Sequence, residues 1–406
     1  MNYIQRAIEP LVKAMCGQFK AVLVTGARQT GKTTMLRHCL GDTYEYVVLD
    51  DINELELAQK APALFFKSHR LPLLIDEVQQ APELFRQIKL TVDRQDVKGL
   101  VCLTGSQTYH LMKHASESLA GRICIIEMSG LSLRELHDVD FSEPFIPSEM
   151  YIQRRSEKIV PYTDIWQRIH RGSMPALADG SISWEQHYRS YIRTYIGRDI
   201  RDLIKASNLT TFSRFMTGIA ARTGELYNAA SIASDIGISL KTVQEWTSML
   251  ESSGIVRLVY PFERNIAKRA LKTPKLYFMD TGLVCALVGW TSPTVAQNGA
   301  MSSALFETFV VSEIIKSHLN AGGDCSRIFF YRDRNMNEID LVIEQDGILY
   351  PIEVKKSARP QAAMAKSFAR LNSIPGFTAG HGCILCLADK KTELSEHVSA
   401  LPIEYV

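Results

Sequence analysis

A glycine-rich loop between an apolar run and a helix-forming run limits most strongly what this 406-residue chain can fold into. Residues Gly26–Thr33 read Gly-Ala-Arg-Gln-Thr-Gly-Lys-Thr, with a strand pattern before them (Ala21–Thr25) and a helix pattern after them (Thr34–His38). Strand, loop, Lys-Thr and helix in this order are the context that a phosphate-binding loop requires. Gly26 and Gly31 allow the tight turns that direct backbone N–H groups inward.

The polar residues of this loop have roles that the motif assigns. We expect Lys32 to reach the β- and γ-phosphates of a nucleotide and the Thr33 hydroxyl to bind Mg²⁺. The helix that begins there adds its dipole and its free N–H groups. The alternative is a glycine turn with an unrelated lysine. The predicted nucleotide-binding residues are Gly26, Ala27, Arg28, Gln29, Thr30, Gly31, Lys32, Thr33 and Thr34.

The composition is that of a globular protein with more than one domain. The hydrophobic share is 46% and the charged share 22%, and the chain is too long for one ordinary core. Because the net charge is only +2, contact with nucleic acid would need a local basic patch. No apolar run reaches membrane-spanning length and the amino terminus lacks a signal-peptide core, so we expect a cytoplasmic protein without a membrane partner. A metal or redox pair at Cys383 and Cys386 is disfavoured, because a strand would point them to opposite faces.

The order of the predicted elements indicates three domains, at residues 1–140, 141–295 and 296–406. Five strand patterns separated by helix-compatible stretches predict a parallel α/β sheet first: Ala21–Thr25, Tyr46–Leu49, Leu71–Asp76, Leu100–Thr104 and Ile123–Met128. A linker without clear periodicity covers Asp138–Pro161, and helical spacing follows, most regularly over Trp184–Ile204. The last region predicts a helix, three strands, a second helix and a further strand: Ser303–Leu319, Arg327–Tyr331, Ile339–Glu344, Ile348–Lys355, Pro360–Leu371 and the run near Cys383.

Two carboxylates follow the third strand pattern, at Asp76 and Glu77. We expect Asp76 to hold the hydration shell of Mg²⁺ and Glu77 to polarise the attacking water as general base. The alternative is a strand that ends at solvent with acidic residues. The paired Asp-Glu and the lack of an Asn-Lys-x-Asp motif favour ATP hydrolysis over the chemistry of small GTPases.

Two further groups of candidates belong to the same predicted sheet. Thr104, Ser106 or Gln107, at the end of the fourth strand, could sense the γ-phosphate, and an ordinary Gly-Ser turn is the alternative. Arg122, just before the fifth strand, could act as an arginine finger, either in its own chain or from a neighbouring subunit. The second case would make the protein a homo-oligomer. A surface salt bridge is the alternative for this arginine.

The middle region contains a helix-turn-helix pattern. Asn228–Gly237 reads as a short helix closed by glycine, and Lys241–Ser252 as a second helix after a short turn. The strand pattern Ile255–Tyr260 gives a winged variant. Arg257–Lys275 carries six basic residues against one acidic residue and could contact phosphates of DNA. However, Glu245 on the second helix would repel DNA, and winged helices also serve as protein contacts.

The last region carries carboxylates and a lysine in the order that a metal-dependent phosphodiesterase needs. Asp340 lies on one strand of a predicted hairpin, and Glu353 and Lys355 lie on the return strand. Asp340 and Glu353 could share Mg²⁺, and Lys355, on the same face as Glu353, could orient the water. Glu307 in the preceding helix could complete the acidic set. The alternative is a hairpin with solvent-facing charges, and a restriction-endonuclease-like fold would not by itself imply cleavage.

In combination these motifs resemble a family of prokaryotic AAA-type ATPases with a carboxyl-terminal domain of unknown function, over nearly the whole chain. The resemblance rests on Thr25–Thr33, Leu74–Gln79, Leu103–Gln107, Leu119–Arg122, Pro274–Gly282, Glu338–Asp340 and Ile352–Lys355. It implies an α/β P-loop NTPase sheet, a winged helix-turn-helix region and a restriction-endonuclease-like α/β domain. We therefore expect an ATP-binding, Mg²⁺-dependent ATPase whose end domain engages nucleic acid. The alternative is an ATP-gated regulatory protein-interaction module with a non-cleaving end domain.

Overall fold

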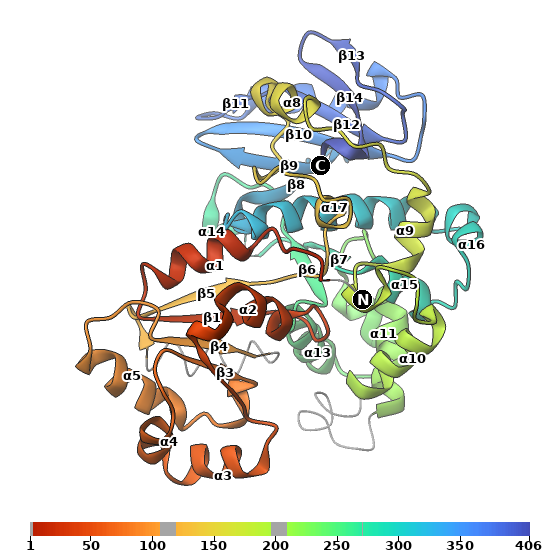
Figure 1. Ribbon diagram of the computed structural model, residues 1–406. Coiled ribbons are helices and arrows are strands. Elements are labelled where there is room, and N and C mark those ends of the chain that lie inside the picture. Colours follow the sequence, from red (N-terminus) through yellow and green to blue (C-terminus); the bar gives the residue numbers. More distant parts are fainter. Residues whose placement is uncertain (1–2, 106–118, 196–208, 270) are drawn as a thin grey trace. The chain divides into compact units, whose positions relative to one another are not determined.

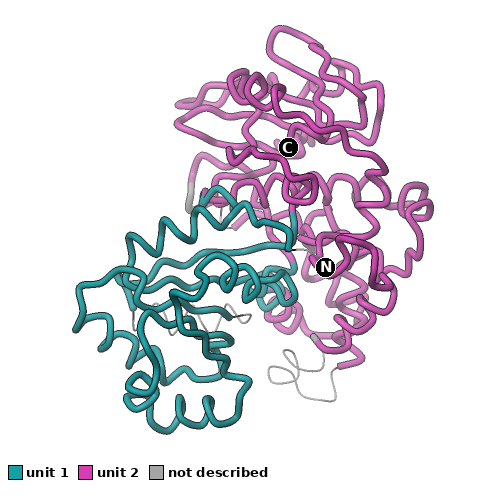
Figure 2. The backbone as a smooth tube through the Cα atoms, viewed as in Figure 1, with its two compact units in different colours: residues 1–131, 248–255, 319–322 teal, residues 132–247, 256–318, 323–406 magenta. Residues whose placement is uncertain are grey.

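The computed structural model describes residues 3–105, 119–195, 209–269 and 271–406, which pack into two compact units (Figure 2). Unit 1 comprises residues 1–131, 248–255 and 319–322, and unit 2 comprises residues 132–247, 256–318 and 323–406. The division into three domains stays a prediction. Among the helices of the described ranges, none is both long enough and apolar enough to span a membrane.

The centre of unit 1 is a five-stranded parallel sheet with the strand order β2-β3-β4-β1-β5 (Figure 1). Its strands are β1 (Ala21–Thr25), β2 (Glu45–Val48), β3 (Leu73–Asp76), β4 (Val101–Thr104) and β5 (Ile123–Glu127). The five predicted strands are thus confirmed, with small shifts at their ends. Because all strands run in one direction, their carboxyl ends meet at one edge of the sheet.

Alternating side chains of β1 enter two hydrophobic cores, one on each face of the sheet. Ala21 and Leu23 pack on the face that carries α3 (Ile52–Lys60), α4 (Pro62–Ser68) and α5 (Leu84–Arg94). Val22 and Val24 pack on the face that carries α1 (Glu9–Cys16) and α2 (Lys32–Leu40). Burial on both faces explains why β1 is almost continuously apolar rather than alternating.

Unit 2 begins with helical segments, among them a helix inside the predicted linker. That helix, α8, starts after Ser148, whose Oγ accepts a hydrogen bond from the Tyr151 N–H at 3.2 Å. The predicted helix Trp184–Ile204 is described as far as Tyr195, and its remainder lies outside the described residues. The helices are α7 (Leu133–Leu136), α8 (Glu149–Ser156), α9 (Ile165–Arg171), α10 (Trp184–Tyr195), α11 (Leu209–Ala220), α12 (Ala229–Ile236), α13 (Leu240–Ser252), α14 (Ile266–Arg269), α15 (Thr281–Leu287) and α16 (Pro293–Asn298).

Helices α12 and α13 are joined by a short turn at Gly237, whose φ of 80° is left-handed and suits glycine. Trp246 of α13 packs against Phe212 and Phe215 of α11, with ring centroids 5.1 and 5.3 Å apart. An antiparallel pair follows, formed by β6 (Val256–Val259) and β7 (Lys275–Phe278). Strand β7 was not among the predicted strands.

Asp280 ties several segments of unit 2 together. Its buried carboxylate caps α15 by accepting from the Leu283 N–H at 2.7 Å and accepts from the Tyr188 hydroxyl at 2.6 Å. The Ser173 N–H and hydroxyl add bonds of 2.7 and 2.8 Å. Gly282 leaves no room for a larger side chain, since an added Cβ would lie 2.4 Å from the Tyr188 hydroxyl oxygen. The Met279-Asp280-Thr281-Gly282 part of the family motif is therefore a packing feature here.

The end of the chain forms a second, mixed sheet with the order β13-β14-β12-β10-β9-β8, to which β11 adds beside β10. Asp346 and Gly347, with φ of 53° and 79°, turn β9 into β10 as predicted. The helix predicted at Pro360–Leu371 is present with shifted ends, at Ala362–Ser373. It is a 3₁₀ helix, and its buried Ala365, Phe368 and Leu371 recur every third residue. The other elements are α17 (Ser302–Asn320), β8 (Ile328–Arg332), β9 (Glu338–Gln345), β10 (Ile348–Lys355), β11 (Thr378–Ala379), β12 (Gly382–Cys386), β13 (Thr392–Ser395) and β14 (Val398–Pro402).

Candidate functional site

The glycine-rich loop lies between the carboxyl end of β1 and the start of α2. Gly26 has a φ of 138° and Gly31 a φ of 89°, backbone conformations that glycine adopts without steric strain. A Cβ on Gly26 would lie 2.0 Å from the carbonyl oxygen of Met128, so no other residue fits there. The Thr30 hydroxyl donates to the Ala27 carbonyl at 2.9 Å, inside the loop. Of the other predicted residues, Arg28 is half-buried in the loop, and Thr34 is exposed in the first turn of α2.

Two buried cations brace this loop through its carbonyl groups. The Lys32 ammonium donates to the Gly26 carbonyl at 3.0 Å and to the Ala27 carbonyl at 2.8 Å. Arg6, only 3% exposed, donates to the Thr30 carbonyl at 2.8 Å and to the Ser129 carbonyl at 2.9 Å. Arg6 links the loop to the segment after β5. Sequence reasoning missed it, because a single arginine before β1 matches no motif.

The carboxylate of Asp76 is surrounded by hydroxyl donors from three other elements. The Thr33 hydroxyl lies 3.0 Å from both carboxylate oxygens, the Thr104 hydroxyl 2.6 Å from Oδ1, and the Tyr46 hydroxyl 3.0 Å from Oδ2. Burial and the charge of Asp76 raise the pKa of Tyr46 to about 12, so its hydroxyl stays a donor. The oxygen atoms of Thr33 and Asp76 are the hard ligands that Mg²⁺ prefers beside a nucleotide, so these residues fit the ion.

Other candidates at this edge of the sheet are placed as follows. Thr104 is buried and its hydroxyl donates to Asp76, so it positions that carboxylate. Sequence reasoning predicted Thr104 only as a candidate sensor of the γ-phosphate and did not include this contact. Ser106 and Gln107 lie outside the described residues. Glu77 follows β3 in a left-handed conformation with φ of 58°, which is rare for a residue with a side chain and is typical of functional sites. Its Oε2 accepts a hydrogen bond from the Gln79 amide.

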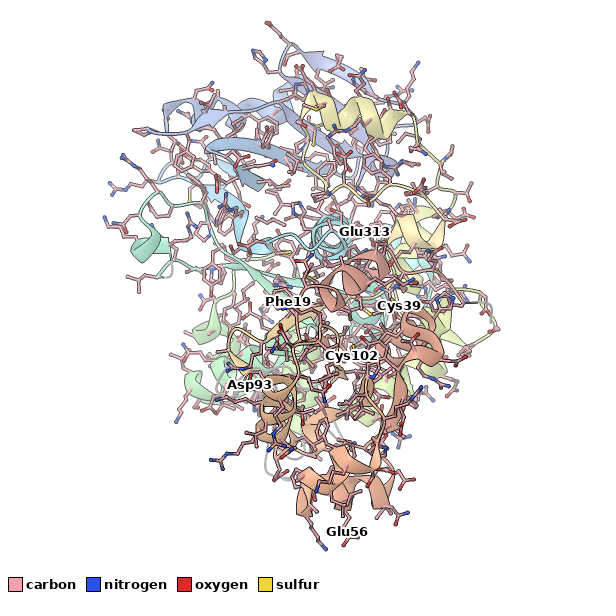
Figure 3. The ribbon with its side chains drawn as sticks, turned by 60° about the vertical axis from the view of Figure 1, so that its left-hand side comes forward. Phe19, Cys39, Glu56, Asp93, Cys102 and Glu313 are labelled. Atoms are coloured by element: carbon pink, nitrogen blue, oxygen red, sulfur yellow. The ribbon has the colours of Figure 1, made fainter. Side chains whose placement is uncertain are left out.

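Arg122 lies at the opposite edge of the sheet from the glycine-rich loop. Its carbonyl accepts from the Ala21 N–H at 3.1 Å, at the start of β1, whereas the loop follows the end of that strand. Its Nε donates to Oδ1 of Asp93 at 2.6 Å, a surface pair in which Asp93 is labelled in Figure 3. The structure therefore does not bring Arg122 to the loop of its own chain, and the cis role is excluded because β1 and β5 are parallel.

A second group of charged side chains lies in unit 2, where the sequence predicted it. Asp340 of β9 accepts from the Val354 N–H at 2.8 Å and from the Lys355 ammonium at 3.0 Å. The same ammonium donates to Glu353 of β10. The hairpin thus brings Asp340, Glu353 and Lys355 together, as expected.

Strand β7 adds two residues to this group that sequence reasoning did not assign to it. The Lys275 ammonium lies 2.7 Å from Oε1 of Glu338 and 3.2 Å from Oε1 of Glu307. The Tyr277 hydroxyl donates to the same Glu307 oxygen at 2.6 Å. Lys275 is the last basic residue of the stretch Arg257–Lys275 that was expected to contact phosphates, but it is only 4% exposed and is not available for such a contact. We call Lys275, Tyr277, Glu307, Glu338, Asp340, Glu353 and Lys355 the acid cluster.

The pKa values of the carboxyl groups in the acid cluster are shifted in different directions. Burial and the Asp340 charge raise the pKa of Glu353 to about 8, against the effect of Lys355. The same two causes raise the pKa of Glu307, against the effect of Lys275. Burial alone would raise the pKa of Asp340, but the ammonium groups of Lys355 and Lys275 lower it below its ordinary value.

The expected metal set Glu307, Asp340 and Glu353 does not converge on one point. Across residues 3–105, 119–195, 209–269 and 271–406, no three His, Cys, Asp or Glu side chains are arranged to hold a metal ion. The reason is local, because an ammonium group of Lys275 or Lys355 lies against each carboxylate of the set. The acid cluster in this arrangement does not fit a divalent ion.

Known protein families match three successive segments of the chain. The model of an AAA domain matches residues 18–137, and those of two domains of unknown function, DUF8612 and DUF4143, match residues 162–294 and 302–406. Together with the parallel sheet and its glycine-rich loop, the first match defines residues 18–137 as an AAA-type P-loop ATPase domain. The uncharacterized proteins Rv2008c of Mycobacterium tuberculosis and Mb2031c of Mycobacterium bovis are each 27% identical over 390 residues, covering 95% of this chain and 80% of theirs.

Two of the solved structures that match this chain have low sequence identity to it. The Walker-type ATPase PABY2304 of Pyrococcus abyssi is 12% identical with a TM-score of 0.42, covering 69% of this chain and 94% of its own. A RuvB variant of Thermotoga maritima is 15% identical with a TM-score of 0.30, covering 62% of this chain and 88% of its own.

Proposed function

We propose that this chain binds ATP with Mg²⁺ and hydrolyses it, and that its carboxyl-terminal part engages nucleic acid. The observation that carries the first half is the set of hydroxyl groups around Asp76, next to the braced glycine loop. Lys32 would contact the β- and γ-phosphates, and Thr33 and Asp76 would hold the ion. The bound Mg²⁺ would neutralise charge on these phosphates.

Glu77 is the proposed general base of this reaction. Its position directly after Asp76 and its left-handed backbone support this role. The test is ATP turnover by the wild-type chain and by Glu77→Gln, with and without DNA or RNA. We expect Glu77→Gln to bind ATP normally and to hydrolyse it far more slowly. Glu56→Gln is the matched control, because Glu56 is exposed on α3, where its carboxylate pairs with Lys60. Normal ATP turnover by Glu77→Gln would exclude Glu77 as the general base.

We also propose that Arg122 acts from a neighbouring copy of the chain, in a homo-oligomer. Because Arg122 lies away from the glycine loop of its own chain, a catalytic role would require the loop of a neighbouring chain. Arg122→Ala should then hydrolyse ATP slowly while binding it normally. Mixing Arg122→Ala with Glu77→Gln should restore part of the turnover, because some sites would combine an intact base with an intact arginine. If the mixture is no more active than its components, the trans role is refuted.

The nucleic-acid part of the proposal rests on α12, α13, β6 and β7, which we interpret as a winged helix. Arg264, Lys268 and Lys272 between β6 and β7 are exposed and available to phosphates. Replacing all three by Gln should weaken DNA binding and reduce its dependence on salt by about three counterions. The matched control replaces one exposed arginine and two exposed lysines of unit 1, namely Arg94, Lys60 and Lys67. Binding that is absent or independent of salt would refute this part.

The acid cluster favours a second candidate, an ATP-gated regulatory module whose end domain does not cleave. Its specific support is that ammonium groups of Lys275 and Lys355 already lie against the carboxylates. Incubating DNA or RNA with Mg²⁺ or Mn²⁺ and either the wild-type chain or Asp340→Ala separates the two candidates. Cleavage by the wild-type chain alone supports a nuclease, and no cleavage with any substrate supports the regulatory module.

A further inference from the structure

Lys275 is a buried cation that comes from outside the sheet that carries most of the acid cluster. It lies on β7, which pairs with β6 and not with β9 or β10. Its ammonium contacts Glu338 of β9 and Glu307 of α17, and it lies 5.7 Å from the centre of the Phe330 ring of β8. One side chain thus joins β7 to three elements of the end domain. Its aliphatic stem and ammonium are both withdrawn from solvent, since only 4% of the residue is exposed.

The ammonium groups supply much of the positive charge that four close carboxylates require. Lys355 lies between Asp340 and Glu353, and Lys275 lies between Glu307 and Glu338. Tyr277 adds a neutral donor on the Glu307 oxygen that Lys275 also contacts.

We infer that Lys275 acts as a built-in cation that closes the acid cluster to divalent metal ions. A metal ion needs several carboxylate oxygens directed at one point, and Lys275 holds Glu307 and Glu338 on itself instead. The cluster then serves to fasten β7 to α17 and β9 and not to activate water. This inference rests on the second candidate function, in which the end domain does not cleave, and it identifies the residue that separates this cluster from a metal site.

The inference predicts that removing the ammonium opens a metal site. Mn²⁺ binding is measured by electron paramagnetic resonance on nucleotide-free, full-length protein. Because no nucleotide is present, ATP hydrolysis does not affect the measurement. The variants are Lys275→Met, Lys275→Met combined with Asp340→Asn, Asp340→Asn alone, and the control Lys272→Met. Lys272 is an exposed lysine of the same segment. All chains keep the same glycine loop, so any Mn²⁺ bound there contributes equally.

We expect Lys275→Met to bind Mn²⁺ about tenfold or more tightly than the wild-type chain, equivalent to about 1.4 kcal/mol. The added Asp340→Asn change should abolish the gain, and Lys272→Met should behave as wild type. A folded Lys275→Met that gains no Mn²⁺ would overturn the inference. If Lys275→Met shows no cooperative thermal transition, Lys275→Gln replaces it, because the amide keeps a donor for Glu338.

The wild-type chain provides a test that does not depend on the folding of any Lys275 variant. If it already binds Mn²⁺ at a site that Asp340→Asn removes, Lys275 does not close the cluster and the inference fails. Equal Mn²⁺ binding by the wild-type chain and Asp340→Asn supports it. Either result is independent of Glu77→Gln turnover, so failure here and failure of the proposed ATPase are told apart.

Discussion

Replacing Thr104 by Val tests whether the hydroxyl groups around Asp76 position it for the proposed reaction. The Thr104 hydroxyl makes the shortest of the bonds to this carboxylate, at 2.6 Å, and the side chain is fully buried. Val has nearly the same shape, so the main change is the loss of one donor to a charged group. In the Thr104→Val chain, once the Thr33 hydroxyl binds the metal ion, the Tyr46 hydroxyl would be the one donor to Asp76 that remains of the three.

The magnitude follows from the energy of a hydrogen bond to a charged group, about 1.5–3 kcal/mol. If this energy holds Asp76 in its reactive orientation, kcat should fall by about 10- to 150-fold. The Kd for ATP, measured with a fluorescent analogue, should change little, because the phosphates are held by the loop and Lys32. Thr104→Ser keeps the hydroxyl and is the matched control for volume. A folded Thr104→Val chain with kcat within about twofold of wild type would refute the reasoning.

The remaining predictions concern the loop, the packing of unit 2 and the response to acid. Gly26→Ala should abolish nucleotide binding in a fluorescence titration because its Cβ would meet Met128, whereas Gly41→Ala, a left-handed glycine with open space around it, should bind normally. Asp280→Asn should lower the urea unfolding free energy by on the order of 3 kcal/mol, since the amide cannot accept all four hydrogen bonds; a loss under about 1 kcal/mol would contradict this. Burial lowers the pKa of His318, so the unfolded chain binds more protons below about pH 6.5 and stability should fall there as the pH drops, by up to about 1.4 kcal/mol per pH unit. The free energy of unfolding in urea should differ less between about pH 5.5 and about pH 7.5 for His318→Gln than for the wild-type chain. An equal difference in both chains would exclude His318 as the cause of the pH dependence.

The nucleotide-binding part of the fold could be predicted from sequence because its signals are local. Strand β1 is a nearly continuous apolar run, and the loop requires Gly26 and Gly31 at fixed positions between a strand and a helix. The proposed roles of Asp76 and Glu77 follow from their places at the last position of β3 and directly after it. In contrast, Arg6 and Tyr46 reach this region from segments without a motif. Arg6 lies just before α1, and Tyr46 lies on β2, which pairs with β3 at the edge of the sheet.

The acid cluster shows where such prediction fails in physical terms. Asp340, Glu353 and Lys355 were predicted together because one hairpin carries all three, and a two-residue turn fixes their register. Lys275 precedes Asp340 by a long stretch of chain, and in sequence it reads as the last basic residue of an exposed wing. Its burial arises from the pairing of β6 with β7, a long-range contact that the pattern of charges does not encode. The charge pattern of a segment therefore predicts a phosphate contact only for side chains that the fold leaves exposed. A buried lysine such as Lys275 can instead pair with carboxylates of its own chain, here those of Glu307 and Glu338.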